Sequence, residues 1–175
     1  MPFKRFLKLT AIAELIAIVA LACAVALPAH ATSFTDYLEN KLADHLFRTT
    51  TFTQPTVLAV SLHTGACSDS SAGTEVTGGS YARVSLNPSN TNWKGTHGTT
   101  TGTSSGTGGT ISNAVAVTFP APTASWGVVT HFAIFDAATA GNMLVCQALT
   151  VSKTINNGDA APSFAVDALT VQIDN

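Results

Sequence analysis

The chain has 175 residues, of which 46% are hydrophobic and 10% are charged, with 8 Lys and Arg against 10 Asp and Glu. Its length fits one domain with short additions, and its charge density lies well below the roughly 25% of a typical soluble domain. This composition excludes an intrinsically disordered chain and a basic nucleic-acid-binding protein.

Residues 1–31 have the layout of a secretory signal peptide. Basic residues precede an apolar run that ends at Leu27, and the cleavage motif Ala29-His30-Ala31 follows. The uninterrupted part of the run, Leu15–Leu27, is shorter than the roughly 20 residues of a transmembrane helix. We therefore expect a cleavable leader over residues 1–31, with a retained membrane anchor as the alternative.

Two other kinds of leader fit less well. Apolar residues continue past Cys23, which disfavours a lipoprotein site, and Leu9 stands where a type IV pilin needs a small residue before its cleavage point. Loss of residues 1–31 removes three cations and one anion, so the mature chain is more acidic than the whole chain, whose net charge is −2. We expect no attraction of the mature chain to nucleic acid or to an anionic membrane.

One amphipathic helix with a linker is expected in residues 32–52. Its apolar stripe recurs every four residues and consists of Phe34, Leu38, Leu42 and Leu46. Ser33 followed by Asp36 resembles a capping box and predicts the start of the helix, and the β-branched run Thr49–Thr51 predicts its end. Because such a helix is marginal alone, we expect the stripe to pack on the rest of the body or on a neighbouring subunit, as an assembly face.

Residues 53–175 are expected to form an antiparallel β-sandwich. Alternating apolar residues predict six strands, over Thr56–His63, Tyr81–Leu86, Ala114–Phe119, Gly127–Phe135, Met143–Val151 and Ser163–Ile173. Gly127–Phe135 is apolar on both faces, which indicates a central strand, and Asp136–Asn142 predicts a hairpin loop shaped by the Asp136 side chain. With one helix, parallel crossovers are not available, so we predict a mainly β fold.

The pattern also predicts which residues are buried and which are exposed. The residues expected in one common core are Leu58, Val60, Val84, Val117, Phe132, Ile134, Leu144 and Val171. Gly95–Thr110 is a Gly/Thr/Ser-rich tract with no Val, Leu or aromatic residue, so we expect an exposed flexible loop there. Thr64–Ser80 is a second Gly/Ser/Thr-rich loop.

No candidate active site stands out, and we expect no catalytic residue, metal site or cofactor. Gly102–Gly106 matches G-x-S-x-G, but a nucleophile elbow needs a strand before it and a helix after it. The glycine-rich tract lacks the Gly-Lys-Ser/Thr of a P-loop. No two histidines of the body have the spacing of metal ligands on one element, and His131 is interpreted as a core or interface residue.

Cysteines and aromatic residues leave two questions open. Cys67 and Cys146 can pair in an oxidising compartment, closing a long loop worth roughly 4 kcal/mol in the chain-entropy model, and stay free in a reducing one. Trp93 and Trp126, with Tyr81, can form a sugar-stacking face, but their scattered positions favour a core or interface role.

From Ser33 onward the chain resembles a family of small tailed-bacteriophage structural proteins, labelled as tail fibre proteins. The matching stretches are Ser33–Arg48, Pro55–Thr64, Gly73–Leu86, Asn113–Val145 and Asn156–Asp174, with Phe119–Asn142 as the most specific run. The resemblance implies a virion structural component with a β-sandwich body, no enzyme activity, and no functional residues to transfer. Members of that family usually begin close to the Ser-Phe-Thr-Asp helix, so the leader is a departure.

Two functions therefore compete. The first is a non-enzymatic virion protein, tail or tail-fibre associated, which acts as a repeated subunit and contacts other virion subunits or itself, and at its exposed loops the host surface. The second is an exported bacterial β-sandwich module of binding or adhesin-like type, in the periplasm or outside the cell. Neither function needs a cofactor, nucleic acid or a membrane once the leader is removed.

Overall fold

Short antiparallel strands make up most of the body. The computed structural model describes residues 34–105 and 109–173, and the leader expected over residues 1–31 lies outside them. The strands are β1 (Ala59–His63), β2 (Val84–Ser85), β3 (Trp93–Lys94), β4 (Thr110–Asn113), β5 (Val117–Thr118), β6 (Gly127–Phe135), β7 (Met143–Ile155), β8 (Ser163–Phe164) and β9 (Thr170–Gln172). The helix α2 spans Asp36–Phe47.

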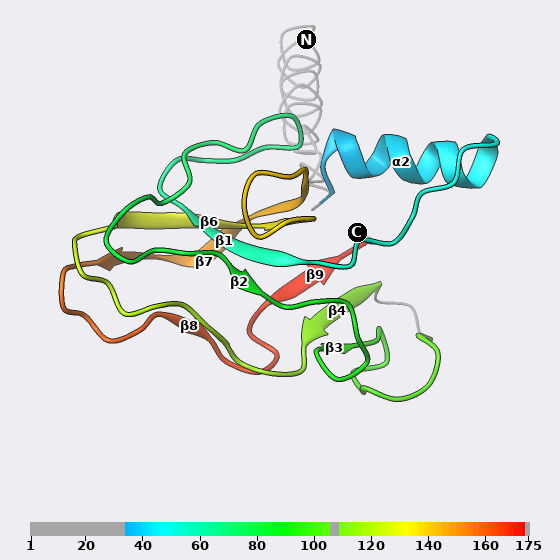
Figure 1. Ribbon diagram of the computed structural model, residues 1–175. Helices are drawn as coiled ribbons and strands as arrows, with labels where there is room; N and C mark the ends of the chain where they lie inside the picture. Colours follow the sequence, from blue (N-terminus) through cyan, green and yellow to red (C-terminus); the bar gives the residue numbers. More distant parts are fainter. Residues whose placement is uncertain (1–33, 106–108, 174–175) are drawn as a thin grey trace, which may run out of the picture. The chain divides into compact units, whose positions relative to one another are not determined.

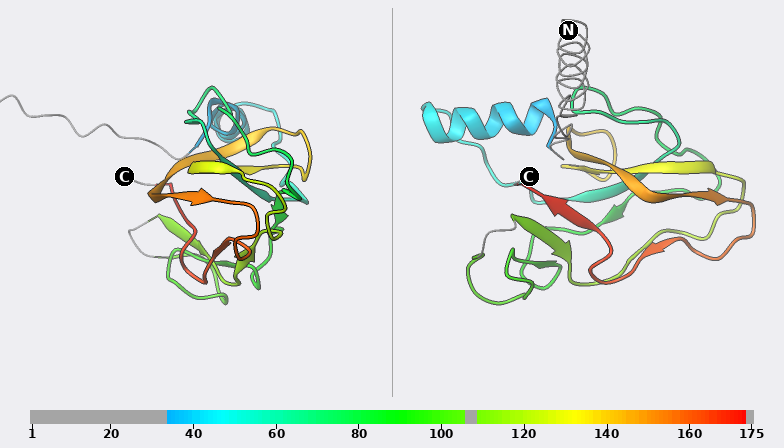
Figure 2. Two further views of the ribbon diagram at one scale, coloured as in Figure 1. Left: turned by 90° about the vertical axis from the view of Figure 1, so that its left-hand side faces the viewer. Right: turned by 180° about the vertical axis from the view of Figure 1, so that it is seen from behind.

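The strands form three sheets in two layers. A four-stranded sheet has the order β2-β1-β6-β7, and the smaller sheets have the orders β3-β4-β9 and β5-β8, all with antiparallel pairing. The four-stranded sheet forms one layer, the two smaller sheets lie below it in Figure 1, and α2 lies above it. The views of Figure 2 show the same layering. For the described residues, the predicted mainly β, antiparallel sandwich with one helix is confirmed.

The central position predicted for Gly127–Phe135 is also confirmed, since β6 lies between β1 and β7. Val60 pairs with Ile134 and Leu62 with Phe132, and these four side chains enter the core between the layers. The opposite face of the sheet is buried as well. A second apolar cluster covers it, and it consists of Cys67, Ala133, Phe135 and Met143, with Cys146 packed against it.

The predicted core is formed with small differences in depth. Six of the eight predicted residues are buried, and Leu58 and Val84 are half-buried and packed against the same cluster. The core also takes in residues from outside the predicted set, chiefly Phe119, Trp126, Val129 and Leu169. One continuous apolar core therefore joins the four-stranded sheet to the smaller sheets.

Several predicted strand limits were wrong. Only Val84–Ser85 and Val117–Thr118 of the second and third predicted strands have a sheet partner. β3 and β4 were not predicted, because each is short and β4 contains a single aliphatic residue, Ile111. Thr110 begins β4 and does not belong to the preceding loop.

The start of α2 also differs from the prediction. The N-cap is Thr35, and not Ser33, which lies outside the described residues: Thr35 is extended at φ −90° and ψ 157°, and its side chain accepts a hydrogen bond from Leu38 N. The Thr35 hydroxyl also donates to Met143 O over 2.5 Å, and its backbone N–H donates to Leu144 O over 3.1 Å. Thr35 thus caps the helix and fixes its first turn on β7.

The hairpin loop between β6 and β7 has the expected turn chemistry. Asp136 accepts hydrogen bonds from the backbone N–H of Asn142 over 2.6 Å and from its side-chain amide over 2.8 Å. Ala140 and Gly141 have positive φ values of 52° and 77°, which close the turn. Among the described residues, no helix is long and apolar enough to cross a membrane.

Candidate functional site

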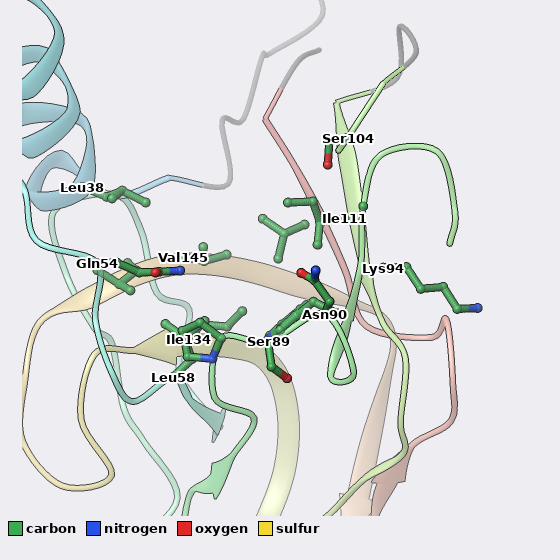
Figure 3. A pocket seen from close by; sticks show the side chains of 15 residues that line it. Leu38, Gln54, Leu58, Ser89, Asn90, Lys94, Ser104, Ile111, Ile134 and Val145 are labelled. Carbon is green, nitrogen blue, oxygen red and sulfur yellow. The ribbon is translucent and has the colours of Figure 1, made fainter. Parts of the chain in front are cut away.

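A cavity of the body lies where α2, the four-stranded sheet and the β3-β4-β9 sheet meet (Figure 3). Its volume is about 350 Å³. The apolar part of its lining comes from all three elements and consists of Leu38, Leu58, Trp93, Ile111, Ile134, Leu144, Val145 and Val171. A cavity of this size with a largely apolar lining can take up an apolar group of modest size.

Polar groups surround the mouth of this cavity. They are Gln54, Ser89, Asn90, Lys94 and Ser104. Lys94 points away from the cavity in Figure 3, and its ammonium group forms an ion pair of 2.5 Å with Asp167. The hydrogen bonds from Lys94 and Ser112 hold the pKa of the Asp167 carboxyl below its ordinary value. The remaining groups at the mouth are amides and hydroxyls, which suit a neutral polar partner.

A partly buried charged cluster lies outside this cavity, and sequence reasoning missed it. Arg83 forms an ion pair with Glu75 over 2.7 Å, and its side chain is 9% exposed. Tyr81 accepts from Leu62 N and donates to Glu75 Oε1, each over 2.9 Å. Burial raises the pKa of Tyr81, and the hydrogen bonds from Arg83 and Tyr81 hold the pKa of Glu75 low in spite of its burial.

His63 completes this cluster. It is fully buried, its Nε2 forms a hydrogen bond of 2.8 Å with Ser61 Oγ, and its ring stacks on Phe135. Burial lowers the pKa of His63, an effect that outweighs the opposing influence of Glu75 and of the Ala72 backbone. Glu75, Tyr81 and Arg83 bond to one another and His63 bonds to Ser61, so we interpret the cluster as structural.

The formal G-x-S-x-G match has no elbow geometry in the described part of the chain. Ser104 lies in a loop, where its hydroxyl accepts a hydrogen bond from Thr96 N, and Gly106 lies outside the described residues. Within residues 34–105 and 109–173, no three His, Cys, Asp or Glu side chains are grouped to hold a metal ion. His131 is half-buried in β6 and bonds to Thr130 Oγ1 over 2.8 Å.

Trp93, Trp126 and Tyr81 pack within the body, which is the role that their scattered positions in the sequence favoured over a sugar-stacking face. Trp126 is buried and donates to Gly79 O over 3.0 Å, and Tyr81 meets it edge-to-face at 5.3 Å. Trp93 is half-buried, lines the cavity and donates to Leu86 O over 2.9 Å. The three side chains therefore make no shared stacking face for a sugar.

The remaining sequence candidates occupy one region around β7. Cys67 and Cys146 are joined by a disulfide, with their Cα atoms 6.0 Å apart. Phe34 forms an isolated bridge with Val145, Leu38 is buried, and Leu42 packs partly against the core. Leu46, the last member of the stripe, is 68% exposed, and its neighbour Phe47 is 86% exposed.

A comparison with protein families covers almost all of this body. The model of the family described as "Podophage GP4 fiber I protein gp80" matches residues 33–172. The chain belongs to this family. It is thus a virion protein of the phage fibre class, in agreement with the resemblance drawn from the sequence. No curated protein matches the chain.

Proposed function

We propose that this fibre-family protein is a non-enzymatic, repeated subunit of the virion fibre, and that copies of the chain associate through the exposed end of α2. The family match over residues 33–172 carries the proposal of a fibre role. The α2 end supports the proposal of self-association. A structural subunit requires no catalytic residues, and in the described residues the G-x-S-x-G serine lacks the surroundings of a nucleophile.

The exposed end of α2 consists of Leu46 and Phe47. The first half of the helix buries Leu38 and part of Leu42 on its own body, so these residues are not available to a partner. Leu46 and Phe47 project beyond that contact, with 68% and 86% of their surfaces exposed. Neighbouring large apolar side chains at the end of a helix are typical of a protein contact, and a second copy is the partner that a repeated subunit always has.

The experiment introduces charge at this end of the helix. Leu46→Asp combined with Phe47→Asp adds two carboxylates without touching the buried half of α2. We expect the double variant to remain folded by circular dichroism and to lose oligomers in analytical ultracentrifugation. Retention of the wild-type oligomer distribution, or a monomeric wild-type protein at all concentrations, would refute association through this end.

Val151→Asp is the matched control. Val151 is 78% exposed and lies on β7, away from α2. A charge at this position tests whether any new carboxylate on exposed apolar surface dissolves the oligomer. We expect the control variant to assemble as the wild type does.

Binding of a host-surface molecule is a second candidate function. The cavity with Gln54, Ser89 and Asn90 at its mouth favours it. An apolar floor with a neutral polar mouth suits an amphipathic group such as a sugar ring with an apolar face. Ile111→Trp would fill the cavity from β4. We expect this variant to keep its fold and lose adsorption to host cells, and unchanged adsorption would exclude the cavity as the binding site.

A further inference from the structure

We propose that the Cys67–Cys146 disulfide is a redox-controlled latch that holds the start of α2 on the body. The latch acts through the segment Ala66–Gly73, which carries Cys67 and, two residues on, Asp69, whose carbonyl oxygen bonds to the first residue of the helix. It concerns the anchoring of α2 and goes beyond the fibre role, on which it does not depend.

The first observation is that this segment has one buried anchor. From Ala66 to Thr74 every residue is exposed except Cys67, which is 9% exposed. The base of the loop is closed by hydrogen bonds from Thr64 N and Gly65 N to Thr74 O. Beyond that base, the disulfide to β7 is the covalent tie that holds the tip of the loop against the sheet.

The second observation is that the tip of the loop touches the helix. Ser68 N donates to Ser71 O over 2.8 Å, which makes a tight turn, and Asp69 lies inside this turn. The Asp69 carbonyl oxygen accepts a hydrogen bond of 3.1 Å from Asp36 N. Asp36 is the first residue of α2, and its N–H is one of the groups that a helix start leaves without a partner inside the helix.

The third observation is that both ends of the latch meet on the same strand. Thr35 is fixed to Met143 O and Leu144 O, and Phe34 bridges to Val145. Cys146 follows directly on β7. The disulfide therefore holds the 66–73 loop beside the β7 residues that bind the start of the helix. In this position the carbonyl group of Asp69 faces Asp36 N.

The chemistry of the latch is thiol–disulfide exchange. Formation removes two electrons and two protons from the two cysteine thiols, and a small-molecule disulfide such as oxidised glutathione accepts them and becomes two thiols. Opening is the reverse reaction with a dithiol reductant, which becomes a disulfide. With the bond open, the 66–73 loop loses its covalent tie and Asp36 N loses its fixed acceptor, so α2 is held by Thr35 and Leu38 with less support.

Hydrogen exchange followed by mass spectrometry tests the latch on the purified full-length protein. The oxidised protein is compared with the same protein in a dithiol reductant. On reduction we expect amides of the first turns of α2 and of residues 66–73 to exchange about tenfold faster or more, while amides of β1 and β6 change far less. The double variant Cys67→Ser/Cys146→Ser should match the reduced protein, and added reductant should not change it.

Three results would overturn the proposal. One is unchanged exchange in α2 when the bond is reduced. Another is an equal acceleration in α2, β1 and β6, which would mean that the bond stabilises the whole body and not the helix start. The third is free thiols at Cys67 and Cys146 after equilibration with oxidised glutathione, measured by alkylation and intact mass.

Discussion

The guanidinium carbon of Arg83 lies 3.6 Å from the centre of the Phe135 ring. From this position Arg83 Nη1 donates to Ala140 O over 2.7 Å and to Ala137 O over 3.1 Å, while its other nitrogens bind Glu75. One cation therefore ties the Glu75 segment to the hairpin loop that follows β6. The Arg83 side chain thereby covers the Phe135 ring of β6.

Removal of this cation should destabilise the body strongly. Arg83→Ala leaves Glu75 in a partly buried site without its cation and leaves two loop carbonyl groups without a donor. We expect the free energy of unfolding to fall by about 3 kcal/mol, measured by urea denaturation near neutral pH.

Arg48→Ala is the control for this variant. Arg48 pairs with Asp44 over 3.3 Å on the surface of α2, and its side chain is 76% exposed. An exposed pair of this kind contributes about 0.5 kcal/mol or less. Equal losses for the two arginine variants would show that the Arg83 network is not a stabilising element.

Acidification should destabilise the body in a window set by His63. Burial depresses the pKa of His63 from its ordinary value of 6.5, so below that pH the unfolded chain binds the proton more readily than the folded chain. Stability is thus fully present above about pH 6.5 and falls as the pH drops through and below that value. The depressed pKa of Glu75 has the same sign and acts below about pH 4.5.

The measurement is the urea midpoint between about pH 8 and about pH 5. His63→Gln should flatten the dependence on pH in the upper part of this window. An unchanged slope in the His63 variant would show that other groups cause the dependence.

Asn113 should be the most sensitive polar residue near the β3-β4-β9 sheet. It is fully buried, its amide donates to Val115 O and Ala165 O over 2.8 Å and 2.7 Å, and its Oδ1 accepts from Leu169 N over 2.9 Å. Asn113→Ala leaves three backbone groups without partners, and we expect a loss of about 3 kcal/mol in the free energy of unfolding.

Two further variants frame that expectation. Asn113→Asp replaces the donating amide by a carboxylate that faces two carbonyl groups, so it should be worse than alanine near neutral pH. Asn92→Ala, which removes one exposed bond to Asn87 O, should cost far less. A variant Asn113→Ala as stable as Asn92→Ala would contradict the role of Asn113.

The leader remains a prediction that expression can test. When the chain is expressed in a bacterium from Met1, we expect cleavage after Ala31, so that the processed protein begins at Thr32. Cleavage there would leave the Thr35 anchor intact, since Thr35 is bound to Met143 O and Leu144 O. The test is the intact mass of the protein in the cytoplasmic and periplasmic fractions. A full-length cytoplasmic product would refute cleavage.

Elements with a regular apolar period could be predicted from the sequence. β6 could be predicted because it is a continuous apolar run, and α2 because its apolar residues recur every four residues. Each pattern fits only one type of secondary structure that buries the apolar side chains. β3 and β4 were missed because each is held by its partner strand more than by its own residues: Trp93 pairs with Asn113, and Ile111 pairs with Val171. Their pairing depends on residues far away in the chain.

The candidate site could be predicted only in part for the same reason. The apolar stripe of α2 is visible in the sequence, but which half is used on its own body depends on where Thr35 meets β7. Tyr81 and Arg83 lie in the predicted strand Tyr81–Leu86, but their cluster could not be predicted, because Glu75 and the carbonyl groups of Ala137 and Ala140 come from other segments of the chain. Asn113 likewise gains its role from three backbone groups that the fold brings to it.

The most direct test of a repeated fibre subunit is quantification of this chain in purified virions. Peptides of this chain are measured by mass spectrometry against isotope-labelled standards, with a virion protein of known copy number as the reference. A repeated fibre subunit must be present in several copies per particle, and virions that carry Leu46→Asp with Phe47→Asp must contain fewer. Absence of the chain from particles, with recovery only in the periplasm or the culture medium, would contradict the virion role and favour an exported binding module.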